Sequence, residues 1–104
     1  MYNYYNILVK IKPGYRIKYS KEKDLLLKET RGVSFEDVLG LVFEGQVLSD
    51  RKHHNPQKYP NQRILVVRVG NYAYAVPYVI DGKKKIVFLK TAYPSREFTK
   101  KYLK

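Results

Sequence analysis

Apolar residues recur at helical spacing in two stretches of the first half of the chain. The leucines at 25–27 begin an apolar stripe shortly after Ser20, a residue type favoured at helix N-caps. The stripe ends at Gly32, which favours helix termination. This pattern predicts a first helix over residues 21–31.

The second stretch begins at Ser34, which is followed three residues later by Asp37, a weaker relative of the capping box. Gly45 marks its end, so a second helix is predicted to run to about Glu44. The apolar face that supports this helix consists of Phe35, Val38, Leu39, Val42 and Phe43.

Alternating and β-branched apolar runs in the second half of the chain predict strands. Three such runs lie at 62–69, 72–80 and 86–91. The first two are separated by Gly-Asn at 70–71 and the last two by Asp-Gly at 81–82, both of which favour tight turns. The three strands are therefore expected to form an antiparallel meander.

Shorter signals complete the predicted fold. Residues 15–19 alternate like a short strand, residues 46–49 offer another, and a short basic helix opens near Pro94. The expected class is α+β: two N-terminal helices packed on an antiparallel meander of three to four strands, followed by a short basic C-terminal helix. Residues 15–104 would form one domain, and residues 1–14 an N-terminal extension or an extra strand.

The charge balance points to a polyanionic partner. Lysine and arginine number 21 against 9 acidic residues, which gives a formal net charge of +12 and an isoelectric point near 9.9. Such a field attracts nucleic acid, so RNA is the expected partner. Because the chain has no cysteine and only two histidines, we expect no metal and no cofactor.

A membrane location is not expected. No apolar run approaches the roughly 20 residues that a spanning helix requires. The first residues also lack the order of basic, apolar and small residues that marks a signal peptide. The protein is expected to be cytoplasmic.

The strongest candidate chemistry lies in a polar loop between the second helix and the meander. His53 and His54 stand there beside Arg51, Lys52 and Lys58. Cleavage of RNA by its own 2′-hydroxyl needs a base, an acid and cations around the phosphorane, and these residue types supply all three. The alternative is that both histidines are solvated or contact phosphate without doing chemistry.

A second group of basic residues lies near the C-terminus. These residues follow the last predicted strand and occupy the last helix, whose N-terminus suits a phosphate. The alternative is an ordinary solvated basic face. The group comprises Lys90, Arg96, Lys100 and Lys101.

The chain has eleven tyrosines. Exposed tyrosines can stack on unpaired RNA bases, whereas tyrosines on strands more often pack against a core. Most are expected to pack, and Tyr59, Tyr74 and Tyr93 are retained with Lys58 as candidate RNA contacts.

The N-terminal half resembles the opening of the BrnT family of RelE-like toxins. The resemblance is carried by the run from Arg16 to Asp24 and by the helix break at Gly32, Val33, Ser34, Phe35 and Glu36. Downstream, the histidine segment, the strand at 63–67 and the basic close follow in the family's order. One departure is the Lys-Thr-Ala-Tyr-Pro-Ser-Arg sequence at 90–96, where the family closes its last strand with Ser-Ala-Arg.

This resemblance implies a RelE/BrnT-like fold and a microbial ribonuclease held inactive by an antitoxin. The antitoxin would be a ribbon-helix-helix protein that binds operator DNA, so this chain would reach DNA only through it. The family's basic catalytic positions would correspond here to His53 or His54, Lys90 and Arg96.

The leading hypothesis is a metal-independent endoribonuclease toxin. Two alternatives remain open: a basic nucleic-acid-binding module without enzymatic activity, and an inactive corepressor scaffold. Because acidic residues are scarce and scattered, a carboxylate-driven or two-metal nuclease is disfavoured.

Overall fold

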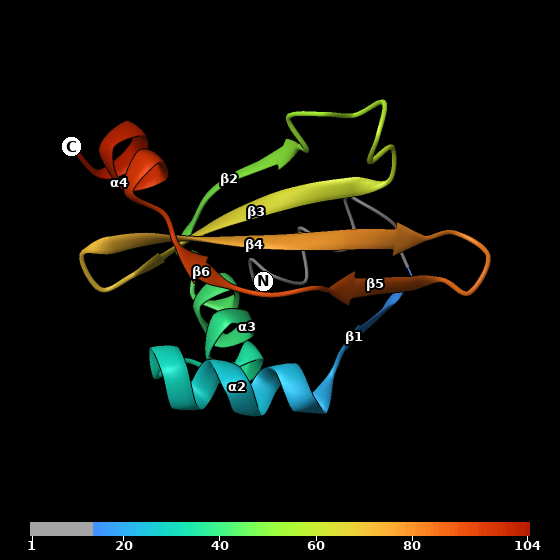
Figure 1. Cartoon of the computed structure of the whole chain (residues 1–104), viewed down its shortest axis with the longest axis horizontal. Helices are drawn as coiled ribbons and strands as arrows, with labels where there is room; N and C mark the ends of the chain where they lie inside the picture. Colours follow the sequence, from blue (N-terminus) through green and yellow to red (C-terminus); the bar gives the residue numbers. More distant parts are fainter. Residues whose placement is uncertain (1–13) are drawn as a thin grey trace.

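The computed structural model describes residues 14–104, so the predicted strand or leader in the first residues lies outside the described part. Figure 1 shows the arrangement of the elements. In chain order they are β1 (Arg16–Tyr19), α2 (Lys21–Arg31), α3 (Phe35–Phe43), β2 (Val47–Lys52), β3 (Gln62–Val69), β4 (Tyr72–Asp81), β5 (Ile86–Leu89), β6 (Tyr93–Pro94) and α4 (Arg96–Leu103).

The sheet corrects the predicted architecture. Within residues 14–104 it has six strands in the order β1-β5-β4-β3-β2, with β6 paired to β4. It is mixed, because β1 runs parallel to β5 while the other pairs are antiparallel. The antiparallel meander of three to four strands behind two N-terminal helices, and with it the arrangement expected from BrnT, is therefore wrong.

The physical reason is that β1 precedes the helices but pairs with β5, a strand near the C-terminal end of the chain. Ile17 of β1 pairs with Val87 of β5, seventy positions later in the sequence. Such a pairing leaves no local signature, since periodicity reports only which side of an element is buried. The domain itself is α+β.

Local capping explains where the two central helices begin and end. Ser20 accepts a hydrogen bond from the backbone N–H of Lys23, and Gly32 ends α2 with a φ of 71°, which favours glycine. At α3, Ser34 and Asp37 form a reciprocal capping box, with N–O distances of 3.0 and 2.9 Å. Both helices therefore start at the residues that the sequence pattern indicates.

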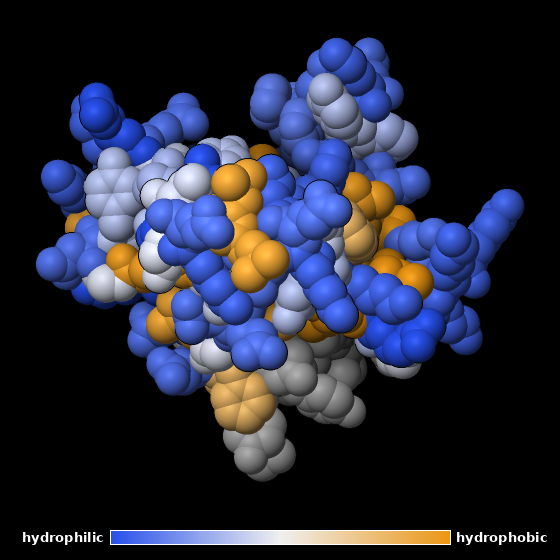
Figure 2. Space-filling model, turned by 60° about the horizontal axis from the view of Figure 1, so that its bottom comes forward, coloured by the Kyte–Doolittle hydropathy of each residue, from blue (hydrophilic) through white to orange (hydrophobic). Residues whose placement is uncertain are grey.

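The main core lies between α2, α3 and one face of the sheet. Phe35 is fully buried, and its ring centroid lies 4.7 Å from that of Tyr19. Leu27 is the buried leucine of α2, whereas Leu25 and Leu26 are 58% and 48% exposed. Figure 2 brings this side of the molecule forward and shows apolar patches separated by hydrophilic side chains. The fully or nearly buried core residues are Leu27, Phe35, Val38, Val42, Leu65, Val67, Val76, Tyr78, Val87, Leu89 and Ala92.

The opposite face of the sheet is covered in part by α4, so the domain has three layers. Because side chains alternate along a strand, Leu65 and Val67 face the main core while Ile64 and Val66 face α4. Phe98 and Tyr102 of α4 pack on this second cluster. In Figure 1, α4 lies at one end of the sheet and the loop after β2 at the other.

A buried hydroxyl fastens α4 to the sheet and provides a test of this packing. Thr99 is 3% exposed, and its Oγ1 accepts from the N–H of Ala73 at 2.8 Å and donates to the carbonyl of Ser95 at 2.7 Å. Thr99→Val should destabilise the protein by about 1–3 kcal/mol, because the buried N–H loses its partner. Thr30→Val is the matched control, since the exposed Thr30 hydroxyl only donates to Leu26 within its own helix. Urea unfolding measures both, and equal losses would contradict the role of Thr99.

Candidate nucleic-acid interface

The end of β2 positions several of the basic residues that the sequence singled out. Arg51 and Lys52 lie in β2 rather than in the loop, because the strand continues to Lys52. The N–H of His53 donates to the carbonyl of Gln62 at 3.1 Å, which extends the pairing one residue further. By alternation, Arg51 and His53 lie on the α4 face of the sheet and Lys52 on the opposite face.

The two histidines form an aromatic stack with a tyrosine of the same loop. The ring centroids of His53 and His54 are 4.3 Å apart at an interplanar angle of 27°, and Tyr59 lies 4.4 Å from His53 on a tilted plane. The ammonium of Lys58 lies 5.5 Å from the Tyr59 ring, within cation–π range. His53 is the central ring and contacts both His54 and Tyr59.

His53 has a defined hydrogen-bond partner and a pKa below its ordinary value. Its Nδ1 accepts a hydrogen bond from the N–H of Asn55 at 3.0 Å, so the neutral ring carries its proton on Nε2. Partial burial lowers the pKa of His53, and the charges of His54 and Lys90 lower it further. Lys90 is held near His53, because its ammonium donates to the side chain of Gln62 at 3.4 Å.

A groove of about 440 Å³ separates β2 from α4. Two contacts with α4 fix the side chain of Arg51 beside the groove. The guanidinium carbon of Arg51 lies 5.3 Å from the centre of the Phe98 ring, and Nη1 of Arg51 donates to the hydroxyl of Tyr102 at 3.2 Å. The groove carries more positive than negative side chains, which suits a phosphodiester. Its lining consists of Arg51, Lys52, His54, Ile64, Glu97, Phe98 and Lys101.

Tyr102 is a residue of this region that the sequence reasoning missed. A hydrogen bond with Ser49 lowers the pKa of Tyr102, partial burial opposes the shift, and the charges of Arg51 and Lys101 lower it further. Tyr102 follows Phe98 by one helical turn on α4. That spacing is the available signal, but it does not indicate a neighbouring arginine.

The structure gathers some predicted residues and separates others. His53, His54, Tyr59, Lys58 and Lys90 lie together, and Arg51 and Lys52 adjoin them along β2.

The remaining candidates lie elsewhere. Tyr74 packs against the main core on the far face of the sheet. Tyr93 is 36% exposed and pairs with Ala75 in the short strand β6. Arg96 and Lys100 lie on α4 outside the groove lining, whereas Lys101, which belongs to the same predicted basic group, lines the groove with Glu97.

Two further findings concern the described part of the chain. Across residues 14–104, no three side chains of the His, Cys, Asp and Glu types lie close enough to hold a metal ion together. None of the helices in that range has the length and apolarity that crossing a membrane requires.

Comparison with known proteins does not assign a family. No protein-family model matches the chain, and no solved structure matches it. A rabbit protein, flavin-containing monooxygenase 5 (Oryctolagus cuniculus), is 37% identical over 49 residues, which is 47% of this chain and 9% of the monooxygenase. The chain therefore spans less than a tenth of that relative's length, and this similarity carries no argument about function.

Proposed function

We propose that this protein is a metal-independent endoribonuclease that acts as the cytoplasmic toxin of a toxin–antitoxin pair. The observation that carries the proposal is the position of His54, which is exposed, lines the groove beside Arg51, and stacks on His53. An imidazole and cationic side chains on one groove are what RNA self-cleavage requires.

The proposed reaction is an internal transfer at phosphorus. Arg51 and Lys101 bind the non-bridging oxygens of the scissile phosphate, and their charge stabilises the phosphorane. The 2′-oxygen forms its bond to phosphorus as the bond to the 5′-oxygen breaks, which yields a 2′,3′-cyclic phosphate and a free 5′-hydroxyl. One proton leaves the 2′-hydroxyl and one is added to the departing 5′-oxygen. His54 carries out one of these two transfers, since histidine can accept or donate a proton near neutral pH, and solvent water carries out the other.

The test is direct cleavage by the purified full-length chain. Incubation with total RNA in the presence of EDTA should give discrete products on a sequencing gel, ending in cyclic phosphates. Intact RNA that is nevertheless retarded in a binding assay would contradict the enzymatic proposal. That result would favour the basic binding module, for which the net charge alone suffices.

The antitoxin part of the proposal is supported by the BrnT resemblance of residues 16–24 and 31–38. The antitoxin would be a ribbon-helix-helix protein that neutralises the nuclease and binds operator DNA, so the chain reaches DNA only through it. Co-expression with the neighbouring open reading frame should yield a complex that has lost RNA cleavage. A stable complex around a chain that never cleaves RNA would favour the corepressor scaffold.

A further inference from the structure

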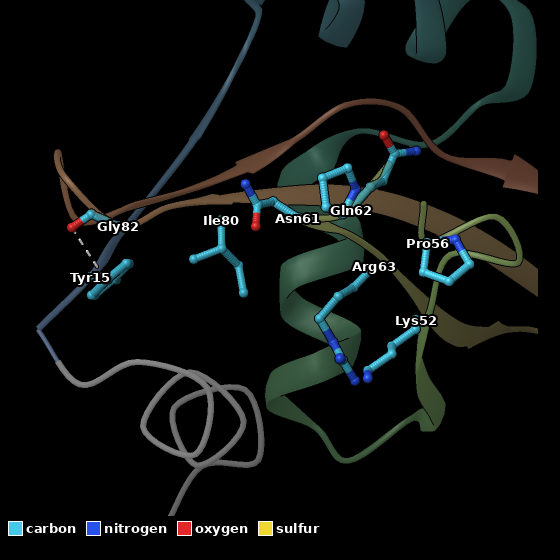
Figure 3. Close-up of a pocket in the computed structure, with 9 residues that line it drawn as sticks. Tyr15, Lys52, Pro56, Asn61, Gln62, Arg63, Ile80 and Gly82 are labelled. Carbon is cyan, nitrogen blue, oxygen red and sulfur yellow. Dashed lines mark hydrogen bonds between the residues drawn. The ribbon is translucent and has the colours of Figure 1, made fainter. Parts of the chain in front are cut away.

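A second pocket lies on the other face of the sheet from the histidine stack. Its volume is about 410 Å³, within the roughly 300–1,000 Å³ range of small-molecule sites. Arg63 and Ile80 line it from β3 and β4, and Tyr15 closes one side by donating from its hydroxyl to the carbonyl of Gly82 at 3.4 Å. Figure 3 shows these side chains around one hollow.

Two cations converge at the edge of this pocket. Lys52 and Arg63 are partners across β2 and β3, and both line the pocket labelled in Figure 3. Arg63 is anchored, because its Nε and Nη2 each donate to Asp50 at 3.2 Å, to the carboxylate and to the backbone carbonyl. The hydroxyl of Tyr78 donates to the same carboxylate oxygen at 2.7 Å, which fixes Asp50 in turn.

The charges at this edge do not balance. Asp50 supplies one negative charge against the two positive charges of Arg63 and Lys52, and Tyr78 takes part of the hydrogen-bonding capacity of that carboxylate. This excess of positive charge favours an anion at the edge of the pocket. A guanidinium held in a fixed orientation beside an ammonium is suited to a phosphate.

The rest of the lining fits the remainder of a nucleotide. Tyr15, Pro56 and Ile80 provide apolar and aromatic surface against which a base can pack, and Asn61 provides an amide donor and acceptor. Lys52 borders both this pocket and the groove beside α4. The two sites therefore meet at the edge strand β2.

We propose that this pocket binds one nucleotide of a single-stranded RNA, whose chain passes around the edge of β2 into the groove that holds His54. The proposal rests on RNA being the ligand of the groove, and it adds a subsite on the opposite face of the sheet. Lys52 contacts the backbone where the strand turns, and Arg63 binds the phosphate of the nucleotide in the pocket.

Amide chemical shifts can locate the RNA on each face. The ¹⁵N-labelled full chain carrying His54→Ala would be titrated with a hexanucleotide and, separately, with uridine 5′-monophosphate. The hexanucleotide should shift the amides of Asn61 and Gly82 at the pocket together with those of Glu97 and Lys101 at the groove. Shifts confined to the groove would overturn the subsite. Equal affinities for both ligands at the pocket would assign it to free nucleotides and overturn the strand path.

Charge variants provide an independent measurement of affinity. Lys52→Gln should weaken hexanucleotide binding about tenfold, and lower the slope of log affinity against log salt by about 0.7 for the lost phosphate contact. Lys84→Gln removes the same charge from the exposed turn after β4 and is the matched control. Equal effects of the two substitutions would overturn the contact at Lys52.

Arg63→Lys separates the pocket from the groove. It retains the positive charge beside Asp50 but lacks the guanidinium fork, so hexanucleotide affinity should fall about tenfold while the groove amides still shift. Unchanged affinity in a variant with wild-type thermal stability would overturn the role of Arg63.

These outcomes are distinguishable from failure of the proposed activity. RNA that shifts the pocket amides but is never cleaved by the unmodified protein would contradict the proposed nuclease activity and would still support the nucleotide subsite.

Discussion

Replacing His54 with alanine is expected to lower the rate of RNA cleavage by about 10²- to 10⁴-fold, the usual contribution of a general acid or base. The affinity for RNA should change little, because Arg51 and Lys101 remain in the groove and supply most of the attraction to phosphate. Single-turnover cleavage and equilibrium binding of the same RNA would be measured side by side. Parallel losses of rate and affinity would mean that His54 binds RNA without moving a proton.

His53 should behave differently, since its Nδ1 is already occupied by the N–H of Asn55. Its proposed role is to position His54 through the ring stack. His53→Ala removes the stack and should reduce cleavage strongly, whereas His53→Phe retains an aromatic ring between His54 and Tyr59 and should recover most of the rate. If His53→Phe were as inactive as His53→Ala, the imidazole itself would be needed.

The pH profile distinguishes positioning from proton transfer. The pKa of His53 is lowered from 6.5, so the ring is neutral near pH 7 and becomes charged only as the pH falls below that ordinary value. Once charged, its Nδ1 can no longer accept from Asn55, and the ring repels His54. Cleavage by the unmodified protein should therefore decline on the acid side, and the decline should be less steep in His53→Phe.

Much of the local structure could be predicted from the sequence because it depends on neighbouring residues. Ser20 and Gly32 bracket α2 at Lys21–Arg31, as the polar start and glycine stop indicate. The capping pair Ser34 and Asp37 likewise marks the start of α3. These signals are short-range, since an N-cap side chain reaches only backbone groups two or three residues ahead.

The topology could not be predicted in the same way. The parallel pairing of β1 with β5 depends on contacts between residues seventy positions apart, and β6 has only two residues. Alternation places Tyr74 on one face of β4, but the sequence does not reveal whether that face is open to RNA or covered by α2 and α3. The helices cover it, so Tyr74 belongs to the core side.

The candidate site shows the same limit. His53 and His54 were recognisable because they are adjacent in a basic segment, but the groove also depends on α4, more than forty residues later. Of the basic residues predicted on the last helix, Lys101 lines the groove, with Glu97 one turn earlier, whereas Arg96 and Lys100 do not. A rotation of α4 by one residue would change which side chains face the groove, and that rotation is set by the packing of α4 on Ile64 and Val66 and by the hydrogen bond of Thr99 with Ala73.

Phe35→Ala is expected to cause the largest loss of stability, about 3–5 kcal/mol, as for other large-to-small substitutions at fully buried aromatic sites. Phe35 has no exposed surface, and its ring lies against that of Tyr19 on a tilted plane. Its N–H anchors the start of α3 by donating to Asp24 at 2.8 Å. The alanine variant keeps the backbone hydrogen bond and removes the ring, so the loss reports packing between α3 and the sheet. A loss of this size is a large fraction of the roughly 5–15 kcal/mol that stabilises a typical domain.

Phe88→Ala is the matched control, because Phe88 lies on β5 with 38% of its surface exposed and lies outside the main core. The Phe88→Ala substitution should lower the free energy of unfolding by about 1 kcal/mol or less, because Phe88 buries less apolar surface than Phe35. Urea unfolding of both variants, with the slopes compared, measures the difference. Similar losses would mean that α3 does not depend on Phe35 for its position. The expected contrast would show that Phe35 supports the packing of α3 on the sheet. Strand β3 of that sheet carries Ile64 toward the groove and Arg63 toward the second pocket. Partial unfolding of α3 should therefore weaken RNA binding on both faces of the sheet.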